Sequence, residues 1–295
     1  PLMHGESIVL RILDQEAIDL DFKTLGFDAK AQGQLTDLLA APNGIVLVTG
    51  PTGSGKTTTL YAGLKTLNSI ERKVFTVEDP IEYQLRGVNQ LQIKPSIGLD
   101  FVHCLRSILR QDPDVIMIGE MRDIETARTA IQAALTGHLV LSTLHTNSAA
   151  ASVIRLLDMG LEDYLLGSTI LGIVAQRLVR KLCASCAVPI ENPAPVLSRL
   201  SPDLQKFAKG LTLLHPKHPV GCAHCRQTGY RGRTTIAEIL VLDEALRRKV
   251  VRGITDRDIE DVARQRGMET LIHSGLRKVM AGETTLDDVL RVART

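Results

Sequence analysis

The stretch Gly50-Pro51-Thr52-Gly53-Ser54-Gly55-Lys56-Thr57 decides the fold of this 295-residue chain. It matches the G-x-x-x-x-G-K-[ST] phosphate-binding pattern at every required position. An apolar run over residues 45–48 precedes the loop and a helical pattern from Thr58 follows it, as the motif requires. Such a loop brings backbone N–H groups to a phosphate, while Lys56 reaches the β- and γ-phosphates and the Thr57 hydroxyl holds Mg²⁺. A glycine-rich turn that matches by chance is the alternative. We predict a nucleoside triphosphate site over residues 50–58.

Composition narrows the class of protein. The formal charge is +2, aromatic residues make up 3% and Trp is absent, which is poor material for stacking nucleic-acid bases, so no nucleic-acid partner is expected. The chain begins at Pro1, and we expect it to be a trimmed chain without a secretory signal. The apolar stretch over residues 164–179 is interrupted by polar residues, which indicates a core or interface helix rather than a membrane span.

Four apolar runs alternate with helical patterns and predict an α/β fold. The expected strands cover residues 45–49, 74–79, 115–120 and 139–145, and the expected helices cover 55–69, 100–111, 123–135 and 148–159. Continuous apolar strands between helices indicate a mostly parallel sheet covered on both faces. We expect residues 88–93 to add an antiparallel edge hairpin.

The flanking regions differ in character and suggest further units. Residues 6–13 form an expected strand, residues 14–27 an expected linker, and Asp28 caps an expected helix to about residue 41. Residues 189–219 are rich in Pro, Lys and Ser. A strand over 236–241 and amphipathic helices follow, with expected caps at Asp243, Asp256, Thr270 and Thr285. The predicted divisions are 1–13, 14–27, a core over 28–182, a cysteine-containing unit over 183–228, and a C-terminal strand and helical unit over 229–295.

Polar residues end the predicted strands at the edge where ligands bind in open parallel sheets. Glu78 and Asp79 end the second strand, Glu120 follows the third in the manner of a Walker B strand, and His145 ends the fourth. Each alone is equally consistent with an ordinary helix cap. We predict Glu120 as the base for hydrolysis, with His145 bonded to the γ-phosphate. The predicted Mg²⁺-associated residues are Thr57, Glu78, Asp79 and Glu120.

Two further residues near these strands differ from the pattern. His138 starts the fourth strand at the opposite end, which suggests a structural role. Gly119 stands where Walker B motifs often have aspartate.

Arginines are candidates for stabilising the transferred phosphoryl group. Arg106 and Arg110 lie four residues apart on one predicted helix, and Arg122 follows the Walker B strand. Solvated surface charges are the alternative for these side chains.

Two C-x-x-C pairs predict a metal centre. Cys183 and Cys186 form one pair, and Cys222 and Cys225 form the other. Four thiolates fill the tetrahedral coordination of Zn²⁺ and leave no open position, so the predicted zinc is structural. A redox C-x-x-C is the alternative. Cys104 stands alone and is expected to be a buried apolar residue.

The order of these motifs resembles the secretion ATPase superfamily. Residues 50–57, 76–82, 109–120 and 136–147 are similar to its Walker A, Asp box, Walker B and His box. The cysteine pairs and residues 229–233 resemble the assembly branch, which comprises the type II secretion ATPases (GspE-like) and the type IV pilus extension ATPases. Residues 178–183 look closer to the type II secretion branch.

The resemblance implies a RecA-like core that works as a homo-hexamer on the cytoplasmic face of the bacterial inner membrane. It implies an ATP-hydrolysing motor for pseudopilus assembly and protein export, with ATP, Mg²⁺ and Zn²⁺ bound and GspL-like and GspF-like platform proteins as partners. Residues 1–13 then resemble the end of a second N-terminal domain, most of which the chain lacks. Arg11 resembles an arginine that closes onto the γ-phosphate, and His138 becomes a candidate functional residue as part of the His box. Thr234-Thr235 stands where the family often has Thr-Gly.

Three other functions stay open at this point. The chain is also consistent with a type IV pilus extension ATPase. A nucleic-acid motor on the same core is disfavoured by the composition, and a non-motor scaffold gated by nucleotide would not depend on hydrolysis.

Overall fold

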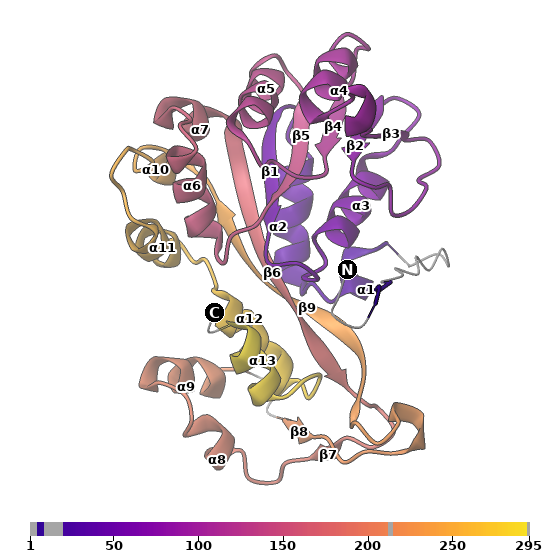
Figure 1. The fold of residues 1–295 in the computed structure, drawn as a ribbon. Helices are drawn as coiled ribbons and strands as arrows, with labels where there is room; N and C mark the ends of the chain where they lie inside the picture. Colours follow the sequence, from indigo (N-terminus) through magenta and orange to yellow (C-terminus); the bar gives the residue numbers. More distant parts are fainter. Residues whose placement is uncertain (1–4, 9–19, 212–214, 294–295) are drawn as a thin grey trace.

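A seven-stranded sheet forms the centre of the molecule (Figure 1). The computed structural model describes residues 5–8, 20–211 and 215–293. Strand order is β3-β2-β4-β5-β1-β6-β9; the first six strands are parallel, and β9 is antiparallel to β6. The strands are β1 (Gly44–Thr49), β2 (Val74–Glu78), β3 (Asn89–Gln92), β4 (Val115–Ile118), β5 (Leu139–Leu144), β6 (Ile170–Leu182) and β9 (Tyr230–Val241).

Helices cover both faces of this sheet, as the continuous apolar strands predict. Successive residues of β1 alternate between two hydrophobic clusters: Ile45 and Leu47 join one, and Val46 and Val48 join the other. The second cluster includes α1 (Phe22–Leu25), α2 (Ala29–Leu39) and α3 (Lys56–Leu67). The first includes α4 (Phe101–Ile108), α5 (Ile124–Leu135), α6 (Ala149–Asp158), α7 (Asp163–Thr169), α10 (Glu244–Arg247) and α11 (Asp256–Gln265). The predicted α/β class with a mostly parallel sheet is confirmed.

The predicted helix caps are mostly confirmed. The Asp28 carboxylate accepts a hydrogen bond from the Ala31 N–H, and Asp243 accepts one from Leu246. Asp256, however, is the first residue of α11 rather than its cap. Thr255 takes that place, because its hydroxyl accepts from the Asp258 N–H while the Asp258 side chain accepts from the Thr255 N–H.

Three sequence predictions are wrong in their local structure. Strand β3 is parallel to β2, because residues 79–88 lead the chain back to the start of β2 before it pairs. The apolar stretch over 164–179 is not one helix: α7 ends at Thr169 and β6 begins at Ile170, since this segment is rich in residues that favour strands and pairs with β1 and β9. The expected linker contains α1, which buries Phe22 against the core.

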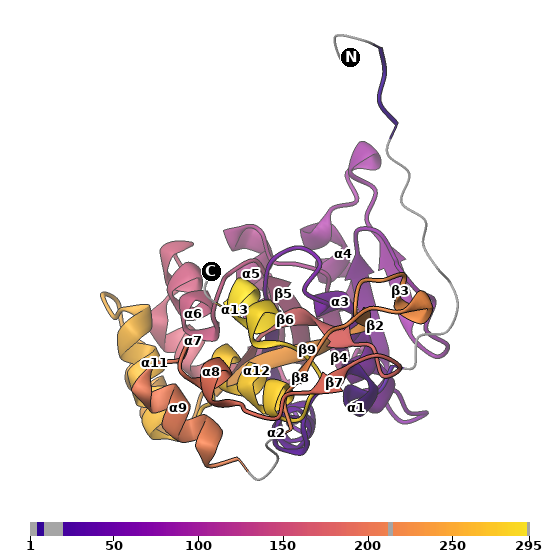
Figure 2. The same ribbon diagram turned by 90° about the horizontal axis from the view of Figure 1, so that it is seen from below.

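Strands β6 and β9 extend past the parallel strands and carry a second packed region (Figures 1 and 2). Helices α12 (Leu271–Met280) and α13 (Leu286–Ala293) pack on this part of the strands around a separate cluster that includes Val179, Ile236 and Val289. The remaining elements are η1 (Pro95–Ile97), β7 (Val188–Pro189), α8 (Ala194–Leu197), α9 (Pro202–Lys209), β8 (Lys217–His218) and η2 (Ala223–Cys225).

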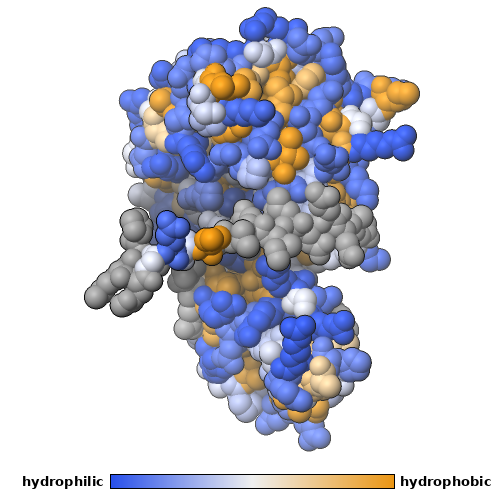
Figure 3. All heavy atoms as spheres, turned by 45° about the vertical axis from the view of Figure 1, so that its right-hand side comes forward, coloured by the Kyte–Doolittle hydropathy of each residue, from blue (hydrophilic) through white to orange (hydrophobic). Residues whose placement is uncertain are grey.

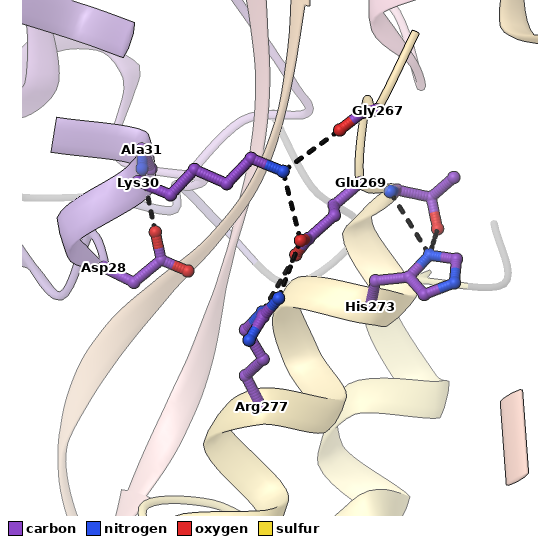
Figure 4. A network of polar contacts seen from close by, with 8 residues as sticks. Asp28, Lys30, Ala31, Gly267, Glu269, His273 and Arg277 are labelled. Atoms are coloured by element: carbon purple, nitrogen blue, oxygen red, sulfur yellow. Dashed lines mark hydrogen bonds and ion pairs between the residues drawn. The ribbon is translucent and has the colours of Figure 1, made fainter. Parts of the chain in front are cut away.

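A polar network ties α2 to α12 (Figure 4). Lys30 Nζ donates to Gly267 O at 3.0 Å and to Glu269 Oε1 at 3.2 Å. Arg277 donates two hydrogen bonds to the Glu269 carboxylate, at 2.7 and 2.9 Å. These bonds from Arg277, with the one from Lys30, lower the pKa of Glu269 to about 2.

The described surface is mixed in polarity. On the face in Figure 3 hydrophilic side chains predominate and apolar ones lie in small groups. The exposed large apolar residues include Ile70, Ile97 and Tyr164, which lie in separate parts of the chain: the turn after α3, η1 and α7. None of the described helices is both long enough and apolar enough to cross a bilayer.

Candidate functional site

The glycine loop joins the carboxyl end of β1 to the start of α3. Gly50, Gly53 and Gly55 all have positive φ, and Gly55 directly precedes the helix. A Cβ on Gly50 would lie 2.6 Å from the Gln176 carbonyl oxygen. The loop therefore requires glycine where the chain turns and where it approaches β6.

Lys56 is held inside this loop. Its Nζ donates to Gly50 O at 2.8 Å and to Pro51 O at 3.2 Å, and the residue is 9% exposed. Burial lowers the pKa of Lys56, although the charge of Glu120 opposes this. The buried Ser54 hydroxyl makes no hydrogen bond to any residue that the structure describes. An enclosed cation and an unpartnered hydroxyl are the groups that a bound phosphate would engage.

A cavity of about 500 Å³ lies beside the loop, and we call it the loop cleft. It brings together most of the residues predicted for the site: Thr52, Gly53, Ser54, Gly55, Lys56, Thr57, Thr58, Glu78, Asp79, Glu120 and His145. Gly50 and Pro51 form the base of the loop through their carbonyl groups. Thr57, Asp79 and Glu120 carry oxygen atoms of the kind that Mg²⁺ and its water shell prefer.

Glu120 is the central carboxylate of the loop cleft. Its side chain is 13% exposed and forms an ion pair with Arg122, and His145 Nε2 lies 3.4 Å from Glu120 Oε2. The bond to Glu120 raises the pKa of Arg122. The arrangement joins the ends of β4 and β5, so one acidic, one cationic and one imidazole group meet at one edge of the sheet.

Glu78 is enclosed, in contrast to its neighbour Asp79. Glu78 is 2% exposed, and its carboxylate accepts hydrogen bonds from Tyr61, Thr76 and Gln90. Asp79 is exposed at the cleft. The two acidic residues of this pair therefore have different environments.

Some predicted residues do not join the cleft. The His138 ring bonds to Ala133 O at 2.8 Å and precedes the six-residue strand β5, so it lies about 20 Å from the loop edge. Arg106, on α4, pairs with Glu125 at 2.9 Å, and Arg110, which follows the end of α4, donates to Arg106 O; both arginines are exposed. Arg11 lies outside the described residues, as does most of the expected strand over residues 6–13.

Four residues near the loop were missed by sequence reasoning. Glu82 and Tyr83 line the cleft after Asp79, and Arg233 reaches it from β9. Gln176 donates to Ser54 O at 2.8 Å and accepts from the Thr59 hydroxyl at 2.9 Å. The sequence did offer a signal for Glu82, because it is the third acidic residue within residues 78–82. Arg233 belongs to the motif over residues 229–233, but only the pairing of β9 with β6 shows that it reaches the cleft.

The four cysteines form a second site, the cysteine cluster, made of Cys183, Cys186, Cys222 and Cys225. All four Sγ atoms lie within 4.8 Å of one another, and three Sγ–Sγ distances are 3.7, 3.8 and 3.9 Å. Sulfurs about 2.3 Å from a tetrahedral Zn²⁺ would lie about 3.8 Å apart. The thiols are free, and these distances are far longer than the roughly 2.05 Å of a disulfide. The donor set therefore fits Zn²⁺.

Backbone groups support thiolate character at one member of this cluster, Cys225. The N–H groups of Cys222 and Gly229 lie 3.1 and 3.2 Å from Cys225 Sγ. Burial opposes ionisation of this thiol, but these hydrogen bonds outweigh it and lower the pKa of Cys225 to about 6. Cys104 is fully buried on α4, away from the cluster, as expected.

Comparison with known proteins adds three findings. A sequence profile described as "Type II/IV secretion system protein" matches residues 1–291. The chain is 56% identical to the type II secretion system protein E of Xanthomonas campestris pv. campestris, over 99% of this chain and 51% of that protein. It is 47% identical to the type IV pilus assembly ATPase PilB of Myxococcus xanthus, over 98% and 51% respectively. It thus spans about half the length of these relatives.

A solved structure is also similar. The pilus retraction motor PilT, crystallised with bound ADP, matches with a TM-score of 0.69 and 29% identity, over 96% of this chain and 69% of that one. The sheet and its helices therefore occur in a protein that binds a nucleotide.

Proposed function

This chain belongs to the family of type II/IV secretion system proteins, and we propose that it hydrolyses ATP as the motor of a bacterial type II secretion system. The proposed work is pseudopilus assembly and the export of proteins. One observation carries the proposal: the phosphate loop with Lys56 and the carboxylate Glu120 lie in the same cleft.

The roles of the cleft residues follow from their chemistry. The loop N–H groups and Lys56 bind the β- and γ-phosphates, and Ser54 supplies a further hydroxyl. Glu120 orients and deprotonates the attacking water, and His145 bonds to the γ-phosphate. Thr57 and Asp79 hold Mg²⁺ and its water shell together with Glu120, and Glu78 supports Asp79 from behind. Bound Mg²⁺ supplies charge neutralisation on the phosphate oxygens.

The wider assembly is part of the proposal. A RecA-like core acting as a homo-hexamer, peripheral on the cytoplasmic face of the inner membrane, is supported by the family and by the likeness to pilus motors. Arg122 and Arg11 are the proposed cations that stabilise the transition state of phosphoryl transfer. The proposed role of His138 lies outside the cleft. The cysteine cluster binds a structural Zn²⁺ within the unit of residues 183–228. GspL-like and GspF-like platform proteins are the proposed partners.

A type IV pilus extension ATPase is the second candidate. The 47% identity to PilB of Myxococcus xanthus favours it over unrelated functions. The chemistry in the cleft is the same for both candidates, and complementation of a secretion-deficient and of a pilus-deficient strain distinguishes them.

Substitution of Lys56 tests nucleotide binding. Lys56→Ala removes the cation held within the loop, and we expect the affinity for ATP to fall at least about 100-fold, since a buried charge–phosphate contact is lost. Titration with a fluorescent ATP analogue measures this, with Lys65→Ala, at the end of the same helix, as the control. Unchanged affinity in Lys56→Ala would remove the basis of the site. Hydrolysis measured against protein concentration tests activation by assembly.

A further inference from the structure

Tyr61 links the phosphate-loop helix to the segment that follows β2. It lies on α3, the helix that begins with Lys56, and is fully buried. Its hydroxyl donates to Glu78 Oε2 and accepts from the N–H groups of Glu82, at 3.3 Å, and Tyr83, at 3.5 Å. One side chain of the loop helix therefore holds both ends of residues 78–83.

Further hydrogen bonds hold the same segment from the other side. Glu78 Oε1 accepts from the Thr76 hydroxyl at 2.6 Å and from Gln90 Nε2, on β3, at 3.0 Å. Gln90 Nε2 also donates to Tyr83 O at 2.9 Å, and Gln90 Oε1 accepts from the Leu85 N–H at 2.7 Å. Glu78 is thus an anchor whose carboxylate is occupied by protein donors.

The residues between these attachments face the cleft. Asp79 directly follows the anchor Glu78, and the Glu82 N–H donates a hydrogen bond to the Tyr61 hydroxyl. Both residues line the loop cleft. We propose that Tyr61 is a positioning residue, which fixes Asp79 and Glu82 at the distance from the phosphate loop that a nucleotide-bound divalent cation requires. This rests on the proposed function, because it assumes that the cleft binds ATP with Mg²⁺.

The environment of Tyr61 favours this role. The Tyr61 hydroxyl is fully enclosed and donates to the Glu78 carboxylate, so no solvent competes for this hydrogen bond. The Tyr61 ring also packs edge-on against Tyr83, with ring centroids 5.9 Å apart. A phenylalanine at this position keeps the packing and loses only the hydroxyl, which makes the test specific.

The experiment measures ATP affinity in Mg²⁺ and in EDTA, which removes free Mg²⁺, for the wild-type protein (the parent) and for Tyr61→Phe. We expect the affinity in EDTA to stay within about twofold, because Lys56 and the loop are unchanged. Mg²⁺ should increase the ATP affinity of Tyr61→Phe about tenfold less than it increases that of the wild-type protein. A loss of this size is typical when a group that supports metal-associated carboxylates is removed. Hydrogen exchange in the nucleotide-free protein should become faster at the Glu82 and Tyr83 amides, which lose their acceptor.

Matched variants separate positioning from general stability. Thr284→Val deletes another fully buried hydroxyl, which donates to Arg180 O at 2.8 Å rather than to the segment of residues 78–83, and should keep the full effect of Mg²⁺. Gln90→Met removes a different donor from the same anchor and should reduce the effect of Mg²⁺ in the same direction as Tyr61→Phe.

Each outcome has a distinct meaning. A Tyr61→Phe protein with the parental Mg²⁺ effect overturns the proposal, and so does an equal loss in Thr284→Val, which would reflect destabilisation alone. A parent that binds ATP equally well with and without Mg²⁺ also overturns it. A parent that binds no ATP in either condition refutes the proposed function instead.

Discussion

The loop cleft and the cysteine cluster are built in opposite ways. The cleft collects residues between positions 52 and 233 from the ends of several strands. Its key groups are held by protein hydrogen bonds, such as those from Lys56 to the loop carbonyls and from Tyr61 to Glu78. The cysteine cluster collects four thiols from two short turns, in a region whose strands β7 and β8 have two residues each. The cleft is shaped by the sheet, whereas the cluster lies on short turns whose four thiols fit a Zn²⁺ ion.

The largest effect should come from breaking the cysteine cluster. Cys183→Ser removes one of four ligands, so we expect zinc to fall from about one per chain to near zero, because structural zinc is worth about 10 kcal/mol or more of folding free energy. Elemental analysis measures the zinc, and limited proteolysis of residues 183–228 measures the loss of structure. Nucleotide affinity should stay within about threefold, since the cleft is built by the sheet.

The lone cysteine provides the control for this test. Cys104→Ala, on α4, should keep the full zinc content. Zinc retained in Cys183→Ser would contradict the assignment, and ATP binding lost together with zinc would show that the two regions are not independent.

A smaller effect is expected at the carboxylate of the cleft. Glu120→Gln keeps the shape of the side chain but removes the base, and we expect kcat to fall about 100- to 1,000-fold while ATP affinity changes little. Steady-state hydrolysis and ATP titration together measure this difference. Secretion that continues in cells carrying Glu120→Gln would favour the scaffold over the motor.

The smallest effect concerns the polar network that joins α2 to α12 (Figure 4). Because Arg277 and Lys30 lower the pKa of Glu269 to about 2, its contribution to folding is present above about pH 4.5 and is lost as the pH falls toward 2. Between pH 5 and pH 3 we expect the parent to lose about 1 kcal/mol through this group, a value reduced for its partial exposure. Glu269→Gln should be less stable than the parent at pH 5, and this difference should shrink on acidification.

Urea unfolding at the two pH values measures the effect. Glu244→Gln removes a carboxylate from an exposed ion pair with Arg248 and serves as the control, with an expected change below about 0.5 kcal/mol. A Glu269→Gln protein whose stability difference from the parent is the same at pH 5 and pH 3 would contradict the expected role of the network.

Much of the fold was predictable because its signals are local. The loop from Gly50 to Thr57, the apolar strands and the Asp28 cap are each encoded within a few consecutive residues. The direction of β3 was not predictable, because it depends on the path that residues 79–88 take before β3 pairs with β2. The strand structure of β6 was not predictable, because it depends on pairing with β1, far earlier in the chain. In the site, Glu120 and His145 were found from their places after apolar strands, whereas Arg233 was not found because β9 arrives from another part of the sequence.

The sequence by itself determined the chemistry: a phosphate loop, acids after the strands and two cysteine pairs. Only the tertiary structure decided which of these groups meet. It enclosed Glu78 while leaving Asp79 exposed, brought Arg233 of β9 to the cleft, and brought the four sulfurs within 4.8 Å. The physical reason is that residue type and spacing are local properties, whereas burial and side-chain partners arise from strand order and packing between distant segments.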